Sequence, residues 1–428
     1  MSTSRTIVGI LVGGGPAPGI NSVISAVTIR SMLGGCDVVG ILDGFKWLME
    51  GSVSQIRPLS IEEVSRIHFR GGSYLGTSRA NPTKKAESLG NVLASLTRLG
   101  ITRLVTIGGD DTAFSSLKLE EQAVGRIQIV HVPKTIDNDL DLPYGIPTFG
   151  FQTARHVAVE IVQNLMVDAH TTLRWYFVVT MGRKAGHLAL GIGKAAGATL
   201  TIIPEEFEER PVRLPRLVDL VIGTMVKRLS EGRSDGVVVL AEGLIEILDP
   251  GDLGGLDHVE RDEHGNLRLA DVDVGDVLRR EVTKGMKALG LATSIVSKNV
   301  GYELRCADPI PFDMEYTRDL GYCAAQFLLD GGTAAMVSIQ NGRFTPIAFK
   351  QMLDPASGRA KVRMVDITAQ SYQIARQYMI RLSDEDFKDV VTLSRYATLA
   401  GLSPEAFRSR FQSVGSSVSG TRPHRGGS

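Results

Sequence analysis

Short apolar runs alternate with segments of helical spacing along the first third of the chain. The runs are typical of buried parallel strands and occupy residues 7–12, 38–42, 103–107 and 125–132. Apolar residues recur with helical spacing in 20–32 and 91–99, and a glycine ends the second of these segments. Strands that alternate with helices form mostly parallel sheets with right-handed crossovers. We therefore predict an α/β domain in this part of the chain.

The same alternation returns in the middle of the chain and predicts a second α/β domain. Its helical and strand-like segments are 150–168, 175–180, 199–203 and 236–241. The stretch 249–276 is polar, charged and rich in glycine, which predicts a lid-like insertion outside the core. The segment 413–428 is rich in Ser, Gly and Arg and is typical of a disordered tail.

Polar residues follow the strand-like run 125–132 at once. Pro133 ends the run, and Lys134, Asp137 and Asp139 come directly after it. In an extended segment the two acids would point to the same side, at the sheet edge where open α/β folds bind ligands. These residues suit phosphoryl transfer. One carboxylate can take a proton, the second acid can bind a metal, and the lysine can bind a polyanion. A polar turn without a function is the alternative interpretation.

Two other strand-like runs end in glycine-rich loops. One loop, 13–19, leads from the first run into a helical segment, and the other places Asp110 and Asp111 after two glycines at a helix start. Such loops allow backbone N–H groups to meet a phosphate. The first loop is neither a dinucleotide fingerprint nor a Walker A loop, and a tight turn is its alternative. For the acid at the helix start, a helix cap is the alternative. Adjacent carboxylates repel unless a cation or donors compensate, which favours a functional pair.

Two further polar residues are candidates for ligand contacts. Arg79 closes the glycine-rich stretch 70–79, and its guanidinium suits bidentate pairing with a phosphate. Glu242 directly follows the run 236–241 and is a candidate ligand for a substrate hydroxyl. A solvated surface position is the alternative for each.

Composition excludes several classes of partner. The chain of 428 residues carries 47 basic and 47 acidic residues, so its net charge is zero and predicts neither nucleic acid nor a membrane as partner. No apolar run approaches the roughly 20 residues that span a bilayer, and residues 1–5 lack the apolar core of a signal peptide. Three cysteines, an odd count, fit a reducing compartment. We predict a cytoplasmic location.

Taken in order, the polar segments resemble those of the phosphofructokinase family. The matching segments are 14–19, 76–79, 108–111, 133–139, 181–183 and 301–305, and the resemblance extends over about 5–341. It implies an enzyme that transfers a phosphoryl group to the 1-hydroxyl of D-fructose 6-phosphate, with Mg²⁺ as cofactor, in glycolysis or gluconeogenesis. The expected fold class is α/β, with two doubly wound three-layer domains and the active site in the cleft between them. The expected donor domain is 1–149, the sugar-phosphate domain is 150–303, and 304–412 completes both.

The resemblance also implies roles for single residues. Asp137 matches the general base, Asp110 the magnesium ligand, and Asp139 supports the same region. Residues that match donor-phosphate contacts are Gly14, Arg79 and Gly109. Residues that match contacts to the acceptor or to the transferred group are Thr135, Ile136, Asp137, Arg174, Met181, Gly182, Arg183, Glu242, Tyr302 and Arg305. An arginine that the family often has shortly before Gly301 has no clear match, and Lys298 is its candidate substitute.

The phosphoryl donor follows from two departures from the ATP-using branch. That branch has glycine where this chain has Asp111 and Lys134, and both residues resemble the pyrophosphate-dependent branch; Pro16 fits that branch too. A side chain at 111 fills space that a nucleotide α-phosphate needs, and its charge repels that phosphate. Pyrophosphate brings no adenosine to supply binding energy, so a cation such as Lys134 gains importance near the transition state. Asp111 and Lys134 therefore join Asp137 among the expected catalytic residues.

Three alternatives and several open points accompany this hypothesis. The first alternative is an ATP-dependent or mixed-donor 6-phosphofructokinase. The second is a kinase of the NAD kinase type, but that family lacks the segment that this chain has at 133–139. The third is a non-catalytic regulatory subunit that only binds sugar phosphates. Arg174 stands where the family places an arginine that crosses from a neighbouring subunit, which implies a homodimer or homotetramer. The sequence leaves open the physiological direction and whether sedoheptulose 7-phosphate is a second acceptor.

Overall fold

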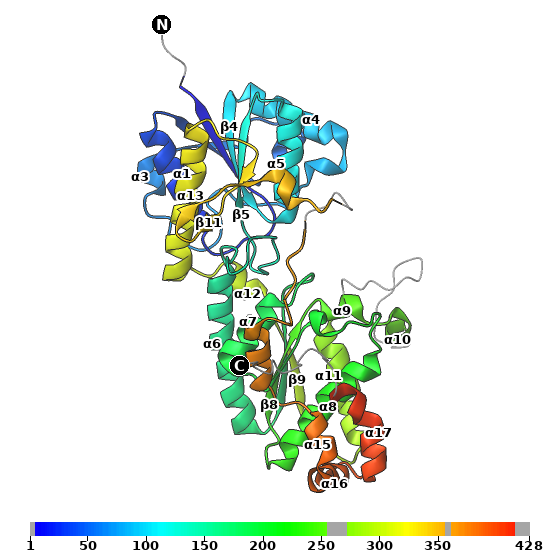
Figure 1. The fold of residues 1–428 in the computed structure, drawn as a ribbon. Helices are drawn as coiled ribbons and strands as arrows, with labels where there is room; N and C mark the ends of the chain where they lie inside the picture. Colours follow the sequence, from blue (N-terminus) through cyan, green and yellow to red (C-terminus); the bar gives the residue numbers. More distant parts are fainter. Residues whose placement is uncertain (1–4, 255–271, 356–360, 416–428) are drawn as a thin grey trace, which may run out of the picture. The chain divides into compact units, whose positions relative to one another are not determined.

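The computed structural model describes residues 5–254, 272–355 and 361–415. The chain forms two compact units (Figure 1). The first unit consists of Met1–Val157 and Tyr302–Arg363, and the second of Ala158–Gly301 and Met364–Ser428. Helix α6 (Phe151–Thr172) contains the first boundary. The chain therefore passes from one unit to the other three times.

A seven-stranded sheet forms the centre of the first unit. Its order is β13-β10-β5-β4-β1-β2-β3, and only the two edge strands, β3 and β13, pair antiparallel to their neighbours. The strands are β1 (Ile7–Val12), β2 (Asp37–Ile41), β3 (Ile56–Leu59), β4 (Ile101–Gly108), β5 (Gln128–Pro133), β10 (Ala335–Met336) and β13 (Ile347–Ala348). A hairpin of β11 (Ile339–Gln340) and β12 (Arg343–Phe344) lies outside this sheet.

Successive side chains of each strand point to opposite faces of this sheet, and apolar side chains are buried on both faces. Helices therefore cover both faces. Val8, Ile10 and Val12 of β1 pack in one core with α1 (Ile20–Leu33) and α13 (Pro311–Leu329). Leu11 packs in the opposite core with α4 (Ala86–Arg98) and α5 (Asp110–Ala123) (Figure 1). The shorter helices of this unit are α2 (Lys46–Met49), α3 (Ile61–Val64), η1 (Pro82–Lys84), α12 (Tyr302–Arg305) and η4 (Phe349–Met352).

The connections of β1 and β4 create a topological switch point. These strands are neighbours, but α1 follows β1 on one face of the sheet and α5 follows β4 on the other. The two loops therefore diverge at the carboxyl end of the sheet. In open α/β sheets this is where ligands bind.

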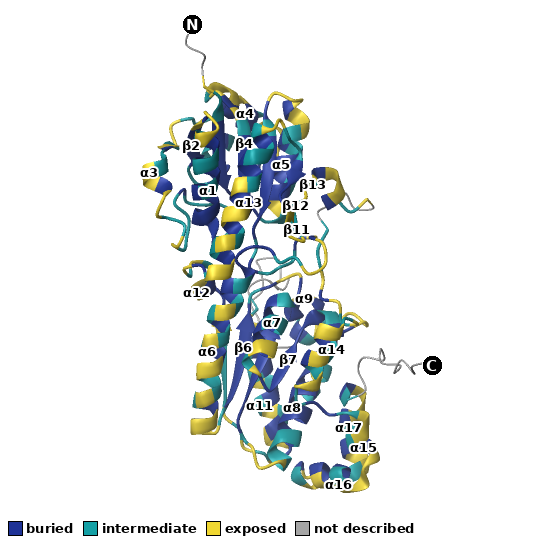
Figure 2. Ribbon diagram, turned by 60° about the vertical axis from the view of Figure 1, so that its left-hand side comes forward, coloured by how far each residue is buried: buried dark blue, intermediate teal, exposed yellow. Residues whose placement is uncertain are grey.

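The second unit is a smaller three-layer domain with a parallel sheet of order β7-β8-β6-β9. Helices α8 and α11 share the core on one face of this sheet with the C-terminal helices, and α7 packs against the other face (Figure 2). The strands are β6 (Trp175–Thr180), β7 (Leu200–Ile202), β8 (Gly236–Ala241) and β9 (Ile295–Val300). The helices are α7 (His187–Ala196), η2 (Pro204–Glu206), α8 (Leu214–Ser230), α9 (Leu244–Ile247), α10 (Pro250–Gly254), α11 (Val274–Ala288), α14 (Gln370–Gln377), α15 (Asp384–Lys388), α16 (Val390–Leu399) and α17 (Pro404–Gly415).

The predicted α/β class with two domains is confirmed, whereas the expectation that 249–276 lies outside the core fails at the two ends that the structure describes. Within the proposed insertion 249–276, residues 255–271 lie outside the described part of the chain. On either side of them, Leu253 and Val274 are buried in the core of the second unit. Residues 413–415 of the predicted tail are the last turn of α17, and the rest of it is not described. In the described ranges, no helix is long and apolar enough to cross a membrane.

Candidate functional site

Three predicted loops meet at the carboxyl ends of β1, β4 and β5 in the first unit. The N–H of Gly13 donates to the Ile107 carbonyl over 2.8 Å, and that of Lys134 to the Gly108 carbonyl over 2.8 Å. The N–H of Gly14 donates to the carbonyl of Ser78, also over 2.8 Å. These backbone bonds hold the first glycine loop, the Gly-Gly-Asp-Asp turn and the start of segment 133–139 against one another.

Gly14 contributes space and not its amide. Its φ of +83° lies in the left-handed region that favours glycine. A Cβ atom at this position would lie 3.5 Å from Nζ of Lys134. The Gly14 N–H already donates to the Ser78 carbonyl and is therefore not available to a phosphate. The lack of a side chain at Gly14 would instead allow a phosphate to approach the backbone closely. Arg79 follows Ser78 directly and is exposed.

The Gly-Gly-Asp-Asp turn is packed onto the sheet by a residue that the sequence did not single out. A Cβ at Gly13 would lie 2.4 Å from Oγ1 of Thr112, and one at Gly108 would lie 2.3 Å from its Cβ. Both glycines therefore make room for this buried threonine in the first turn of α5. Threonine at 112 is an ordinary helix residue by sequence, so only the packing shows its role.

Asp110 and Asp111 occupy the first turn of α5, where the helix dipole favours negative charge. The N–H of Asp111 donates to Oδ1 of Asp110 over 2.9 Å, which fixes that carboxylate relative to the helix end. Asp111 is exposed and Asp110 half-buried. Gly109 precedes them, and a Cβ there would lie 3.5 Å from the Lys134 carbonyl oxygen.

Lys134 brings a buried cation to the same place. Only 5% of its surface is exposed, and its Nζ donates to the Gly15 carbonyl over 2.5 Å. Burial lowers the pKa of Lys134 to about 8; the Asp137 carboxylate opposes this change, and the Arg305 guanidinium adds to it. The Asp139 and Asp110 carboxylates also oppose the lowering of the Lys134 pKa.

Arg305 supplies a second cation beside the first glycine loop. Its Cζ would lie 3.6 Å from a Cβ at Gly15. The guanidinium also lies over the ring of Tyr302, 5.0 Å from its centroid, and Tyr302 itself is 77% exposed. The family resemblance implies that Arg305 contacts the sugar phosphate. The structure places it next to the first glycine loop, 13–19, which is expected to contact the donor.

His131 supports the Gly-Gly-Asp-Asp turn from inside the sheet. It is fully buried; its Nε2 lies 3.0 Å from the Gly108 carbonyl and its Nδ1 lies 2.9 Å from the Thr106 hydroxyl. Burial lowers the pKa of His131 to about 3, against the opposing effect of the Gly108 bond, so the ring is neutral. A carbonyl only accepts, so Nε2 carries the proton and Nδ1 accepts from Thr106. The Gly108 carbonyl therefore accepts from both the His131 ring and the N–H of Lys134.

The segment around Asp137 is a turn, which corrects the extended geometry expected from its alternating acids. The N–H of Asp137 donates to Oγ1 of Thr135 over 3.0 Å. Asn138 has a φ of +57°, a left-handed conformation that asparagine tolerates, and its Oδ1 accepts from the N–H of Thr148 over 3.0 Å. Thr148 also donates its hydroxyl to the Thr135 carbonyl over 2.7 Å. The neighbouring Ile136 is buried. Side-chain oxygens thus bend the segment, which sequence alternation does not reveal.

The second unit brings together its own predicted residues at the ends of β6 and β8. The N–H of Glu242 donates to the Thr180 carbonyl over 2.9 Å, and Nε of Arg183 lies 3.3 Å from Oε1 of Glu242. Gly182 has a φ of +126°, and a Cβ there would lie 2.8 Å from the Ala185 carbonyl. The Met181 side chain fills the space that a Cβ at Gly301 would need. An exposed arginine beside a carboxylate suits a phosphorylated ligand with hydroxyl groups.

Within one chain, Arg174 lies far from the cluster formed by Met181, Gly182, Arg183 and Glu242. It directly precedes β6, whereas Met181 directly follows it. A six-residue strand spans roughly 20 Å. The two residues therefore lie at opposite ends of the strand.

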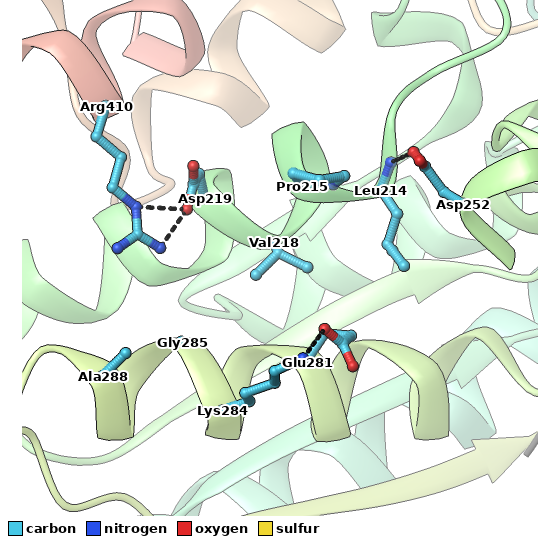
Figure 3. A pocket seen from close by; sticks show the side chains of 10 residues that line it. All are labelled: Leu214, Pro215, Val218, Asp219, Asp252, Glu281, Lys284, Gly285, Ala288 and Arg410. Atoms are coloured by element: carbon cyan, nitrogen blue, oxygen red, sulfur yellow. Dashed lines mark hydrogen bonds and ion pairs between the residues drawn. The ribbon is translucent and has the colours of Figure 1, made fainter. Parts of the chain in front are cut away.

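A surface cavity of about 390 Å³ in the second unit contains none of the predicted residues (Figure 3). Its walls come from α8, α11, α10 and α17. Both cations are paired, Arg410 with Asp219 at 2.7 Å and Lys284 with Glu281 at 3.8 Å. The cavity also contains Asp252, so its acids outnumber its bases and it does not suit a phosphate.

Comparisons with known proteins indicate the same family as the motifs. A family model described as Phosphofructokinase matches residues 7–328. The "Pyrophosphate--fructose 6-phosphate 1-phosphotransferase" of Thermotoga maritima is 53% identical over 408 residues, 94% of this chain and 97% of that protein. The protein of the same name from Naegleria fowleri is 48% identical over 413 residues, 94% of both.

A solved structure shows the same fold. It is a pyrophosphate-dependent phosphofructokinase from Nitrosospira multiformis, with a TM-score of 0.66 and 18% sequence identity. The match covers 87% of this chain and 90% of that chain. At this identity the likeness shows similarity of fold alone.

Proposed function

The chain belongs to the phosphofructokinase family, and we propose that it transfers a phosphoryl group from pyrophosphate to the 1-hydroxyl of D-fructose 6-phosphate. The products are fructose 1,6-bisphosphate and phosphate. One observation carries the donor assignment: Asp111, at the start of the helix that follows β4, and the buried Lys134, directly after the adjacent strand β5, stand beside the switch point of the sheet. The names of the two relatives support the same donor and acceptor.

Asp137 is the proposed general base. Its carboxylate takes the proton of the sugar 1-hydroxyl as the hydroxyl oxygen attacks the phosphorus of pyrophosphate. The bond from that phosphorus to the bridging oxygen breaks, and phosphate leaves. Charge accumulates on the phosphoryl oxygens during this step, and the Lys134 ammonium and the Arg305 guanidinium beside the first glycine loop stabilise it. The Thr135 hydroxyl orients the base through the N–H of Asp137.

The residues present fit a magnesium ion that arrives with the donor. The described residues contain no group of three or more His, Cys, Asp or Glu that would form an all-protein cage. Mg²⁺ commonly uses only one or two carboxylates together with phosphates and water. We propose Asp110 as its ligand, with Asp139 in support, as the family resemblance implies; Asp110 stands in the first turn of α5, and both carboxylates oppose the lowering of the Lys134 pKa. When bound, the ion neutralises charge on the phosphates.

The remaining contacts are assigned to the donor and acceptor as the family resemblance implies. We propose that the donor phosphates contact Gly14, Arg79 and Gly109 in the first unit. Acceptor contacts in the second unit are proposed for Met181, Gly182, Arg183 and Glu242; those in the first unit are proposed for Thr135, Ile136, Asp137, Tyr302 and Arg305. The division into a donor domain and a sugar-phosphate domain remains a prediction. We also propose a cytoplasmic location, because the odd number of cysteines and the three free thiols fit a reducing compartment.

We propose further that Arg174 acts on the sugar phosphate of a second subunit, because its own chain places it at the far end of β6 from Met181. Arg174→Ala should then raise KM for fructose 6-phosphate more than KM for pyrophosphate. In a mixed oligomer with Arg183→Ala, a shared site would contain both arginines and recover activity. Mass spectrometry would verify subunit exchange before the assay. A verified hybrid with no recovered activity would contradict the shared site.

A product assay tests the proposed function. Purified protein with fructose 6-phosphate, pyrophosphate and Mg²⁺, followed by ³¹P NMR, should form fructose 1,6-bisphosphate and phosphate in equal amounts. EDTA should stop the reaction, and excess Mg²⁺ should restore it. Binding of fructose 6-phosphate without any product would instead support a non-catalytic regulatory subunit.

A further inference from the structure

Arg363 contacts the proposed catalytic turn from a part of the chain that lies beyond the family match, which ends at residue 328. Its side chain donates to the Asn138 carbonyl from both Nε and Nη2, over 3.1 and 3.0 Å. Nη2 also donates to Oδ1 of Asn138. Nη1 donates to the carbonyls of Ile146 over 2.7 Å and Leu142 over 3.3 Å. One guanidinium therefore binds three residues along the segment that follows Asp137.

The main chain of this region adds to the same contact. The N–H of Arg363 donates to the Asp139 carbonyl over 2.8 Å. Val362 forms an isolated antiparallel bridge with Leu140. Two of the residues bound in this way, Asn138 and Asp139, directly follow Asp137. The segment is thus held by side chain and backbone together.

Only arginine among the side chains has the geometry for this task. Its planar fork carries five N–H donors in fixed directions, whereas lysine offers a single ammonium on a flexible stem. The acceptors lie along a turn that includes the left-handed Asn138. Without the fork, half-buried carbonyls would be left without donors, which disfavours the folded geometry of the segment.

Tyr316 supports the far end of the same segment. Its hydroxyl donates to the Pro147 carbonyl over 3.2 Å, next to Thr148, which itself binds Asn138 and Thr135. The segment 138–148 is therefore held at both ends by residues that come from later in the chain. This leaves the orientation of Asp137 dependent on contacts outside its own motif.

We propose that Arg363 is a positioning residue for phosphoryl transfer, which holds the Asp137 turn in the geometry that the base requires. This inference rests on the proposed role of Asp137. Misplacement of a reacting group by about 1 Å can cost roughly 10²-fold in rate. Loss of Arg363 should therefore lower turnover and leave the binding of either substrate nearly unchanged.

The test compares Arg363→Ala and Arg363→Lys with a control two residues earlier in the chain, Lys361→Ala. The Lys361 side chain is 41% exposed and forms an ion pair with Asp141 at 3.8 Å. We expect kcat to fall about 10- to 100-fold in Arg363→Ala, with KM for both substrates within about threefold and the loss in Arg363→Lys intermediate. Lys361→Ala should keep kcat within about twofold, as is usual for an exposed ion pair.

Hydrogen exchange separates positioning from general stability. In Arg363→Ala, amides of 138–148 should exchange faster, whereas those of β1 and β4 should exchange as in the parent protein. An Arg363→Ala protein that is less stable but keeps its kcat per folded molecule would overturn the proposal. If that variant does not fold, Arg363→Lys with an unchanged kcat would overturn it as well.

Asp137→Asn in the same assay separates this inference from the proposed function. Turnover retained in Asp137→Asn would remove the base on which the proposal depends. An inactive Asp137→Asn beside a fully active Arg363→Ala would leave the base intact and reject the positioning role alone.

Discussion

Asp137→Asn should fold, bind fructose 6-phosphate and lose most of its turnover. Loss of a general base costs about 10²–10⁴-fold in kcat, and we expect the upper part of this range because the base acts where an alkoxide forms beside phosphate charge. Asparagine has the shape of aspartate and keeps the backbone bond from residue 137 to the Thr135 hydroxyl. The fold and the turn should therefore survive, and only the proton acceptor is removed.

Asp141→Asn is the matched control for this change. Asp141 lies in the same segment, is half exposed and pairs with Lys361 at 3.8 Å. Its kcat should stay within about twofold of the parent value, as expected for a surface ion pair. If Asp137→Asn kept most of its kcat in steady-state assays at saturating substrates, another group would have to be the base.

Lys134→Gly should lower turnover with pyrophosphate by about 10²–10³-fold, because one preorganised stabiliser of transition-state charge is worth about 2.7–4 kcal/mol. Lys134→Met fills the same space without charge and should lose a similar factor. A kcat that stays intact in Lys134→Met would show that the ammonium is a spectator.

The pH profile gives a second readout for Lys134. With a pKa of about 8, the ammonium form dominates below that pH and is lost above it. For the free enzyme, kcat/KM for pyrophosphate should then fall as pH rises through about 8. The same fall should be absent in Lys134→Met.

Asp111→Gly should admit ATP without improving the use of pyrophosphate. The exposed carboxylate at the start of α5 is removed together with its bulk. Asp111→Asn keeps the bulk and removes only the charge, so the two variants separate steric exclusion from repulsion. The double variant with Lys134→Gly should have weak ATP activity and little pyrophosphate activity, although neighbouring changes need not add. Unchanged kcat/KM for ATP in Asp111→Gly would reject exclusion at this position.

Strongly apolar strands could be predicted from the sequence because burial on both faces leaves a continuous run. The predicted segments 175–180 and 236–241 coincide with β6 and β8, each buried at every position. The sequence pattern does not indicate β9, because this edge strand is only half-buried and carries Ser297, Lys298 and Asn299. Edge strands pair on one side alone, so polar residues are tolerated there.

The loops of the candidate site could be located from sequence, but their internal geometry could not. Glycine loops and acids at strand ends indicated the switch point of the first unit. The turn at Asn138 and the support from His131 depend on side-chain hydrogen bonds that alternation does not encode. Arg363 is more remote still, since it lies 217 to 225 residues from the residues whose carbonyls its side chain binds.

The central claim is that pyrophosphate is the phosphoryl donor, and a donor comparison on the unaltered protein tests it most directly. Initial rates of fructose 1,6-bisphosphate formation would be measured with pyrophosphate or ATP as the only donor, at saturating fructose 6-phosphate and Mg²⁺. We predict a kcat/KM for pyrophosphate that exceeds that for ATP by about 10²-fold or more, the effect of a single preorganised interaction. Equal or higher turnover with ATP at saturating donor would contradict the account.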